Sequence, residues 1–313
     1  MHEGPLLLPG IFPGLPPTFF LAFALGNMRT SVPLAVLALL AAGGLAGCAD
    51  ARSPAGDTRR VALDTIPSFP EHFVAPIEEA HADSVWRTRD ALAAGLTVRF
   101  GGQTTLDGQM LMETESGRVR LKLGGDTVAV FDGRQAWVAP DSAALPRARF
   151  HLRTWPYFLA APYKLDDPGT RLARRGRMPV QQAPAQDDAA FNETMPAARL
   201  TFAPGTGDSP DDWYVLYRDP QSGRLAAMGY VATYGAATAE EATPHAIVYG
   251  DYEKVDGVPV PTNWAFYNWS KKQGPHGERT GRVTLHNPRF TTPPDSAFVP
   301  PPGAERSARP AEG

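Results

Sequence analysis

The chain has 313 residues, of which 43% are hydrophobic, and a formal net charge of −3. Such a composition is globular and supplies enough apolar residues for a core, whereas a nucleic-acid binder would carry a basic excess. The chain contains 32 prolines and 30 glycines, which favour turns over long helices, and its single cysteine excludes an intrachain disulfide or a cysteine-based metal cluster.

Residues 28–47 have the order of a secretory signal. The positive residue Arg29 precedes an apolar run, and small residues then follow up to Gly47. Even when it is extended to Leu45, the apolar run has about 14 residues, fewer than the ~20 that a membrane-spanning helix needs. We therefore expect a cleavable signal and no transmembrane helix here.

The segment 1–27 precedes this signal and is proline-rich, with no lysine or arginine. It is either an unusual extension or a segment before a true start at Met28, and we favour the second interpretation. Both interpretations place the whole signal region, 1–47, outside the mature fold.

The signal ends in Leu45-Ala46-Gly47-Cys48, which resembles the bacterial lipobox. That resemblance implies that Cys48 carries acyl chains and attaches the protein to a membrane, since more than one chain is needed for stable anchoring. An ordinary signal peptide with an incidental cysteine is the alternative. Residues 48–67 are small and polar and read as a lipid-anchored tether. Ala49, in place of an acidic residue, resembles the signal for the outer membrane, facing the periplasm or the cell surface.

The first expected element of the body is a helix, possibly in two pieces, from Glu71 to Ala94, ended by Gly95. A two-residue period then replaces the helical one, because "RVRLKL" (118–123) alternates apolar and charged residues. Turn residues every 8–12 positions indicate antiparallel hairpins. The other strands expected in this half are Gly108–Glu113, Thr127–Phe131 and Gln135–Ala139.

Residues 148–169 interrupt the strands with an apolar, aromatic stretch in which Pro156 and Pro162 limit regular helix to short pieces. We expect this segment to cover one face of the sheet, and we expect 173–196 to be a polar loop. "WYVLY" and "NWAFYNW" do not alternate, so these strands should contact apolar groups on both faces, either a helix or a ligand. The strands expected in this half are Ala198–Phe202, Asp212–Arg218, Arg224–Tyr234, His245–Val255, Val260–Trp269 and Thr280–His286.

Three segments carry a family likeness. "VYGDYEKVDGVPVPTNWAFYNWS" (248–270) resembles a hairpin of the bacterial lipoprotein-carrier-like (LolA/LolB-like) superfamily, "FDGRQAWVAP" (131–140) resembles its strand turn, and 156–169 resembles a segment of a branch of lipid-anchored envelope lipoproteins. The resemblance implies a mainly β (α+β) fold, in which a strongly curved antiparallel sheet forms an unclosed barrel and helices cover its concave face. It implies a scaffold more securely than a function. We expect one domain over 68–300 and a disordered tail over 301–313.

The aromatic residues and methionines suggest a function. Carriers of this shape hold acyl chains in the concavity, and an apolar site with few polar groups suits lipid tails. We therefore expect a non-catalytic, monomeric envelope protein that binds a lipid, an acylated peptide or another hydrophobic ligand. The residues expected to line the site are Met110, Met112, Trp137, Trp155, Phe158, Tyr163, Tyr230, Trp264 and Phe266.

Two other functions compete with ligand binding. Plain core packing of the same aromatic residues would leave a structural lipoprotein of the envelope with a self-filled interior. A hydrolase with His81 or His245 as base is the third hypothesis. No HExxH spacing or local His/Asp/Glu cluster indicates a metal, and no glycine pattern indicates a nucleotide cofactor, so we expect neither.

Overall fold

The computed structural model describes residues 68–181, 193–206, 209, 211–233 and 242–307. Within them it contains three α-helices, three short 3-10 helices and thirteen strands. The helices are α1 (Phe69–Ala80), α2 (Asp83–Trp86) and α3 (Ala148–Ala160), with η2 (Ser142–Ala144), η3 (Ala161–Tyr163) and η4 (Asp295–Phe298). The strands are β1 (Ala91–Phe100), β2 (Gln103–Glu113), β3 (Val119–Leu123), β4 (Val128–Phe131), β5 (Ala136–Ala139), β6 (Thr170–Val180), β7 (Glu193–Phe202), β8 (Trp213–Arg218), β9 (Leu225–Val231), β10 (His245–Val255), β11 (Val258–Ser270), β12 (Gly274–Thr291) and β13 (Glu305–Ser307).

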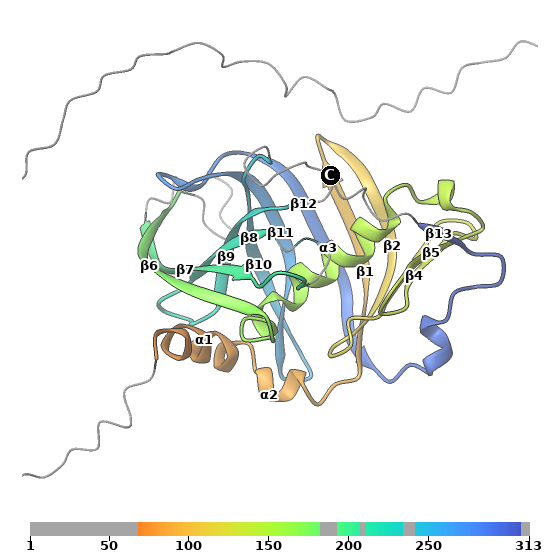
Figure 1. Cartoon of the computed structure of the whole chain (residues 1–313), viewed down its shortest axis with the longest axis horizontal. Coiled ribbons are helices and arrows are strands. Elements are labelled where there is room, and N and C mark those ends of the chain that lie inside the picture. Colours follow the sequence, from red (N-terminus) through yellow and green to blue (C-terminus); the bar gives the residue numbers. More distant parts are fainter. Residues whose placement is uncertain (1–67, 182–192, 207–208, 210, 234–241, 308–313) are drawn as a thin grey trace, which may run out of the picture. The chain divides into compact units, whose positions relative to one another are not determined.

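The described strands form a single antiparallel sheet in the order β13-β5-β4-β3-β2-β1-β12-β11-β10-β9-β8-β7-β6. Its ends, β13 and β6, do not pair with each other, so the sheet stays unclosed. Figure 1 shows the sheet curving around α3, which crosses its concave side, while α1 and α2 lie at one end of the strands. The prediction of a mainly β, curved and unclosed sheet is confirmed.

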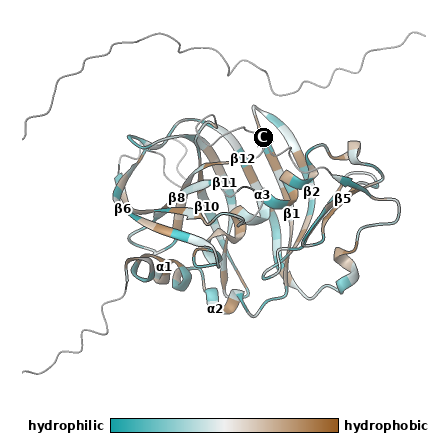
Figure 2. Ribbon diagram, viewed as in Figure 1, coloured by the Kyte–Doolittle hydropathy of each residue, from teal (hydrophilic) through white to brown (hydrophobic). Residues whose placement is uncertain are grey.

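Local sequence explains several elements. The β10–β11 hairpin closes at Asp256-Gly257, whose φ angles of 45° and 93° are the positive values that a tight hairpin turn requires. Strand β3 buries Val119 and Leu121 and leaves Lys122 exposed, as its alternation predicts. Figure 2 shows hydrophobic and hydrophilic residues alternating along the strands. The sequence therefore fixes which face of each such strand turns inward.

The main core lies between α3 and the concave face. The helix turns its buried residues Leu152, Trp155 and Phe158 to the sheet, and the Trp155 ring lies 6.3 Å from the Phe266 ring. α3 also runs through Pro156 without a break, although we predicted only short helical pieces there. Burial of the helix face against the sheet outweighs the one backbone hydrogen bond that proline removes.

A second, smaller cluster occupies the other face of strands β6–β10. Val215 and Tyr217 of β8 point into it, while Tyr214 and Leu216 point into the main core. The aromatic end of β11 packs on this cluster, where Trp269 Nε1 donates a 2.8 Å hydrogen bond to Tyr217 Oη. The apolar groups that "WYVLY" requires are thus side chains of α3 on the concave face, such as Tyr157 against Tyr214, and the sheet's own side chains on the other face.

Three predicted boundaries are corrected. The helix predicted to reach Ala94 ends at Trp86, and residues 91–100 form β1, because pairing with both β2 and β12 buries this segment on both faces. The predicted loop 173–196 contains most of β6 and the start of β7, which pair from Thr170↔Phe202 to Val180↔Glu193. Past residue 300, β13 pairs with β5, so residues 305–307 are strand where we predicted a disordered tail.

Candidate functional site

A cavity of about 300 Å³ lies beside α3, away from the packed centre of the core. Residues from α3 form one wall, and the remaining walls come from the β2–β3 turn, the segment that leads into β6, and the ends of β7, β8 and β9. The lining residues are Met112, Glu113, Glu115, Ser116, Gly117, Phe150, Leu152, Arg153, Thr154, Pro156, Tyr157, Phe158, Ala160, Lys164, Asp167, Pro168, Thr170, Phe202, Thr206, Ser209, Asp212, Tyr214 and Ala232.

Aromatic rings make up the apolar part of this lining. Tyr157 of α3 lies 5.3 Å from Tyr214 of β8, measured between ring centroids, and Phe202 of β7 meets Tyr214 edge-on at 5.9 Å. Phe158 and Met112 are buried at the back of the cavity. Such a wall offers contact to a hydrocarbon chain or a flat apolar group without supplying any reactive atom.

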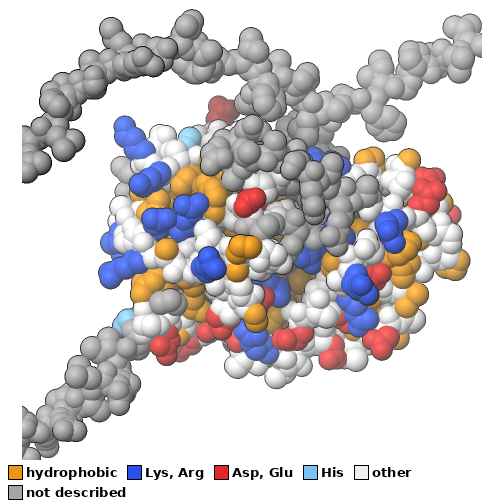
Figure 3. All heavy atoms as spheres, in the orientation of Figure 1, with side chains coloured by type: hydrophobic (Ala, Val, Ile, Leu, Met, Phe, Trp, Pro, Cys, Tyr) orange, Lys and Arg blue, Asp and Glu red, His pale blue; other side chains and the backbone are white. Residues whose placement is uncertain are grey.

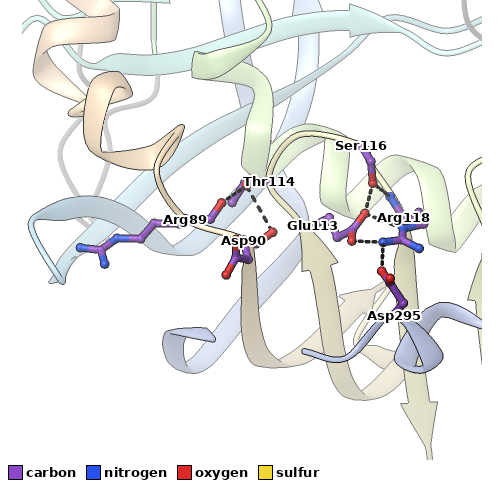
Figure 4. A network of polar contacts seen from close by, with 7 residues as sticks. All are labelled: Arg89, Asp90, Glu113, Thr114, Ser116, Arg118 and Asp295. Atoms are coloured by element: carbon purple, nitrogen blue, oxygen red, sulfur yellow. Dashed lines mark hydrogen bonds and ion pairs between the residues drawn. The ribbon is translucent and has the colours of Figure 1, made fainter. Parts of the chain in front are cut away.

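Ion pairs hold the two ends of the cavity. Lys164 Nζ lies 3.4 Å from Asp167 Oδ2 on the segment that leads into β6. At the β2–β3 turn, Arg118 makes a two-pronged contact with Glu113 and a 3.0 Å contact with Asp295 (Figure 4). Ser116 also donates to Glu113, so the carboxylate on the cavity wall is neutralised and fixed. The same view shows Thr114 donating to the carbonyls of Arg89 and Asp90.

Asp212 is the carboxyl group of the lining with the most altered acidity. Its Oδ1 accepts hydrogen bonds from the Thr233 backbone N–H at 2.6 Å and from Thr233 Oγ1 at 2.7 Å. Burial raises the pKa of Asp212 to about 6, against the lowering effect of the Thr233 hydrogen bonds. The two residues connect the start of β8 to the end of β9, so Asp212 has a clear structural role at the edge of the cavity.

Of the nine residues predicted to line a ligand site, two line the cavity, six lie in or on the main core, and Trp137 belongs to neither. Met112 and Phe158 line the cavity. Met110, Trp155, Trp264 and Phe266 are almost fully buried in the main core, and Tyr230 packs on it with its ring 5.0 Å from Phe158. Tyr163 stacks on Trp86 at 4.1 Å, and Trp137 Nε1 donates to Asp132 Oδ2 at 2.8 Å. A ligand role for these nine stays a prediction, best placed at Met112 and Phe158.

His81 and His245, the two histidines considered as bases, lie in buried or half-buried positions within the fold. His81 is fully buried, and its Nε2 accepts the Leu225 backbone N–H at 3.0 Å. Burial, with the charge of Arg224 as a smaller cause, lowers the pKa of His81 to about 3. His245 is half-buried at the start of β10, and burial lowers its pKa as well. Neither histidine lines the cavity.

Within the part of the chain that the structure describes, no three His, Cys, Asp or Glu side chains gather as a metal site would require. The same part contains no helix of the length and apolarity needed to cross a bilayer. Cys48, predicted to carry the lipid, lies outside the described residues, so the anchor stays a prediction.

Comparison with known proteins finds similar folds among solved structures. They include a LolA superfamily protein from Nitrosomonas europaea (11% identity over 74% of this chain and 98% of that one, TM-score 0.43). A DUF1329 family protein from Desulfovibrio piger is 11% identical over 72% and 96% of the two chains (TM-score 0.45), and an outer membrane lipoprotein-sorting protein domain from Vibrio parahaemolyticus is 12% identical over 71% and 94% (TM-score 0.35). No family model and no curated protein matches the chain. The likeness is one of fold alone.

Proposed function

We propose that this chain is a lipid-anchored lipoprotein of the bacterial envelope that binds a hydrophobic ligand, such as one acyl chain, in the cavity beside α3. The observation that carries the proposal is the cavity itself, which has an aromatic wall and neutralised ends. Its volume of about 300 Å³ stands at the lower limit for small-molecule sites. It therefore suits one chain or ring system rather than a lipid with several chains.

Burial alone supplies enough free energy for such binding. A single acyl chain that loses roughly 300 Å² of exposed surface gains about 7 kcal/mol at 25 cal/mol per Å². Immobilising the chain and the ligand consumes a large part of this gain. We therefore expect a modest affinity that needs no acid–base group, which is consistent with the positions of His81 and His245 away from the cavity.

The second candidate is a structural lipoprotein with a self-filled interior. The packing of Trp155 of α3 against Phe266 of β11 favours it, because these rings fill the centre of the concavity with the protein's own atoms. The two candidates differ only in what the peripheral cavity holds. A ligand found there supports the first, and an empty cavity supports the second.

The test combines extraction of bound lipid with a variant that fills the cavity. Protein purified from envelopes is extracted with organic solvent, and the extract is analysed by mass spectrometry. Thr154 is a partly exposed α3 residue of the lining, so Thr154→Trp should fill the cavity at little cost in stability. The matched control is Thr280→Trp at an exposed position of β12.

We expect a stoichiometric apolar molecule with the unaltered protein and with Thr280→Trp, and at least a tenfold loss with Thr154→Trp. The same amount of lipid from all three proteins would show that any ligand sits elsewhere. Repeated absence of lipid from the unaltered protein would favour the structural lipoprotein. A mass measurement of the mature N-terminal peptide tests acylation of Cys48 separately.

A further inference from the structure

Strand β6 carries a concentration of positive charge on a chain whose net charge is negative. Its arginines at 171, 174, 175 and 177 are all exposed, and Arg199 of β7 lies opposite Ala173 in the register. Figure 3 shows lysine and arginine side chains gathered on the side of the molecule where Figure 1 places β6. We call these five residues the β6 arginine patch.

No carboxylate neutralises this patch within the described residues, because none of the ion pairs found there includes one of its five arginines. Arg177 donates to Thr194, while Arg174 and Arg199 lie against the rings of Phe69 and Trp213. Burial lowers the pKa of Arg199, and the nearby charge of Arg175 lowers it further. Arg175 and Arg199 therefore hold like charges close together, at a cost in stability.

Protection of a sheet edge is the bland explanation, because charges on an edge strand discourage pairing with another molecule. β6 already has two such features, a register shift beside Gly176 with its φ of 74° and the proline at 179. Protection also works with charge of either sign. A concentration of positive charge beside the start of α1 therefore needs a reason other than edge protection.

We infer that the β6 arginine patch docks the protein on a membrane of anionic phospholipids. The location of the chain's entry favours a membrane over an acidic peptide. The ring of Phe69, the first residue of α1, lies 6.0 Å from the Arg174 guanidinium, so the described domain begins beside the patch. This step rests on the proposed anchor at Cys48, whereas the charge of the patch does not.

The length of the segment between Cys48 and α1 would allow the proposed anchor and the β6 arginine patch to act together. A flexible chain of 20 residues, the length of 48–67, has a root-mean-square span of roughly 25 Å, while salt screens charges beyond about 8 Å. A tether of that length would let the domain meet the lipid surface often, and at contact each arginine would strengthen binding about fivefold. The domain would then lie with β6 against the membrane rather than rotate freely on its anchor.

The test measures sedimentation of the mature chain, residues 48–313, with vesicles, and Cys48→Ser removes the acylation site. One set of vesicles contains phosphatidylglycerol and phosphatidylethanolamine, and the other contains phosphatidylcholine only. The double variant R171E/R175E reverses two charges of the patch. Its control, R134E/R289E, makes the same change in charge at exposed arginines of the β4–β5 turn and of β12.

We expect salt-sensitive binding to the anionic vesicles only, a loss on the order of a hundredfold with R171E/R175E, and at most a fewfold loss with R134E/R289E. Equal loss with both variants would reduce the effect to net charge and overturn the proposal. So would tighter binding to polyglutamate than to anionic vesicles, which would indicate an acidic peptide. If R171E/R175E instead aggregates while binding is unchanged, the patch protects the edge. Lipid extracted from the cavity of the same variant shows whether the proposed function stands independently.

Discussion

The Leu225 backbone N–H donates a 3.0 Å hydrogen bond to His81 Nε2, joining two residues 144 positions apart in the sequence. His81 caps the C-terminal end of α1, and Leu225 begins β9. The Tyr163 hydroxyl donates to the carbonyl of the same histidine at 3.2 Å. One buried histidine thus joins the first helix to η3 through its carbonyl and to the sheet through its imidazole, which must stay neutral to accept the N–H.

The burial of His81 predicts that stability falls in acid. Its folded pKa of about 3 lies below the usual 6.5, so the unfolded chain binds the proton first as the pH drops. The contribution is complete above pH ~6.5 and declines by up to ~1.4 kcal/mol per pH unit toward pH 3. His81→Gln keeps an acceptor without titrating, so it should flatten this slope in urea unfolding measured from pH 7 to 4. His72→Gln, at an exposed position of the same helix, should leave the slope unchanged. An unaltered slope in His81→Gln would refute the assignment.

The raised pKa of Asp212 predicts a dependence of stability on pH opposite to that of His81. Burial raises its pKa to about 6 from 3.8, so the folded protein holds this proton more tightly than the unfolded chain. The stabilisation that comes from this tighter proton binding is complete below pH ~4 and is lost as the pH rises through 6. Asp212→Asn keeps an oxygen for Thr233 and should raise the free energy of unfolding at pH 8 by about 1–2 kcal/mol, with little change at pH 4. Asp126→Asn, at an exposed turn, is the control, and equal effects at both pH values would contradict the prediction.

The two carboxylates that pair with Arg118 should contribute different amounts to the free energy of unfolding. The Glu113 side chain is 16% exposed, whereas that of Asp295 is 95% exposed. Glu113→Gln should therefore cost about 1 kcal/mol in urea unfolding, because it weakens a two-pronged, partly buried ion pair. Asp295→Asn should cost less than about 0.3 kcal/mol, since exposed pairs contribute little. A larger loss from Asp295→Asn would show that η4 depends on this contact.

A substitution at Gly229 tests how closely the second cluster is packed. A Cβ at this position would overlap the Trp269 indole, which is held by Tyr217. Gly229→Ala should destabilise the protein by about 2–3 kcal/mol, because the ring cannot move without leaving its hydrogen bond. Gly124→Ala has nothing within 4 Å and should stay within about 0.5 kcal/mol. Equal melting temperatures for the two variants would mean that the cluster is loosely packed.

Local signals in the sequence predicted much of the sheet but not all of it. The hairpin at Asp256-Gly257 and the alternation of β3 are decided by neighbouring residues. β1 is different, because "ALAAG" (91–95) favours helix and becomes strand only through β2 and β12. β6 has four arginines and no regular apolar face, so its pairing with β7 leaves no local signal.

The candidate site was the harder prediction. Composition showed an excess of aromatic residues, but it could not tell which rings fill the core and which face a cavity. Trp155 and Phe158 are three positions apart on α3, yet only Phe158 lines the cavity. Tyr157 and Tyr214 were not predicted, because their meeting depends on how α3 lies over β8. Such a position follows from the packing of distant segments, not from a motif.

The place of β12 in the sheet determines when this protein can fold. β12 joins β1 to β11, and Thr97 and His286, which lie 3.1 Å apart across β1 and β12, are 189 residues apart in the sequence. A nascent chain that lacks β12 holds two strand groups that cannot join, and such long-range closure is slow. Assembly of the whole sheet must therefore wait until residues 274–291 are available, so the two strand groups stay unjoined for most of the time that the chain is being made.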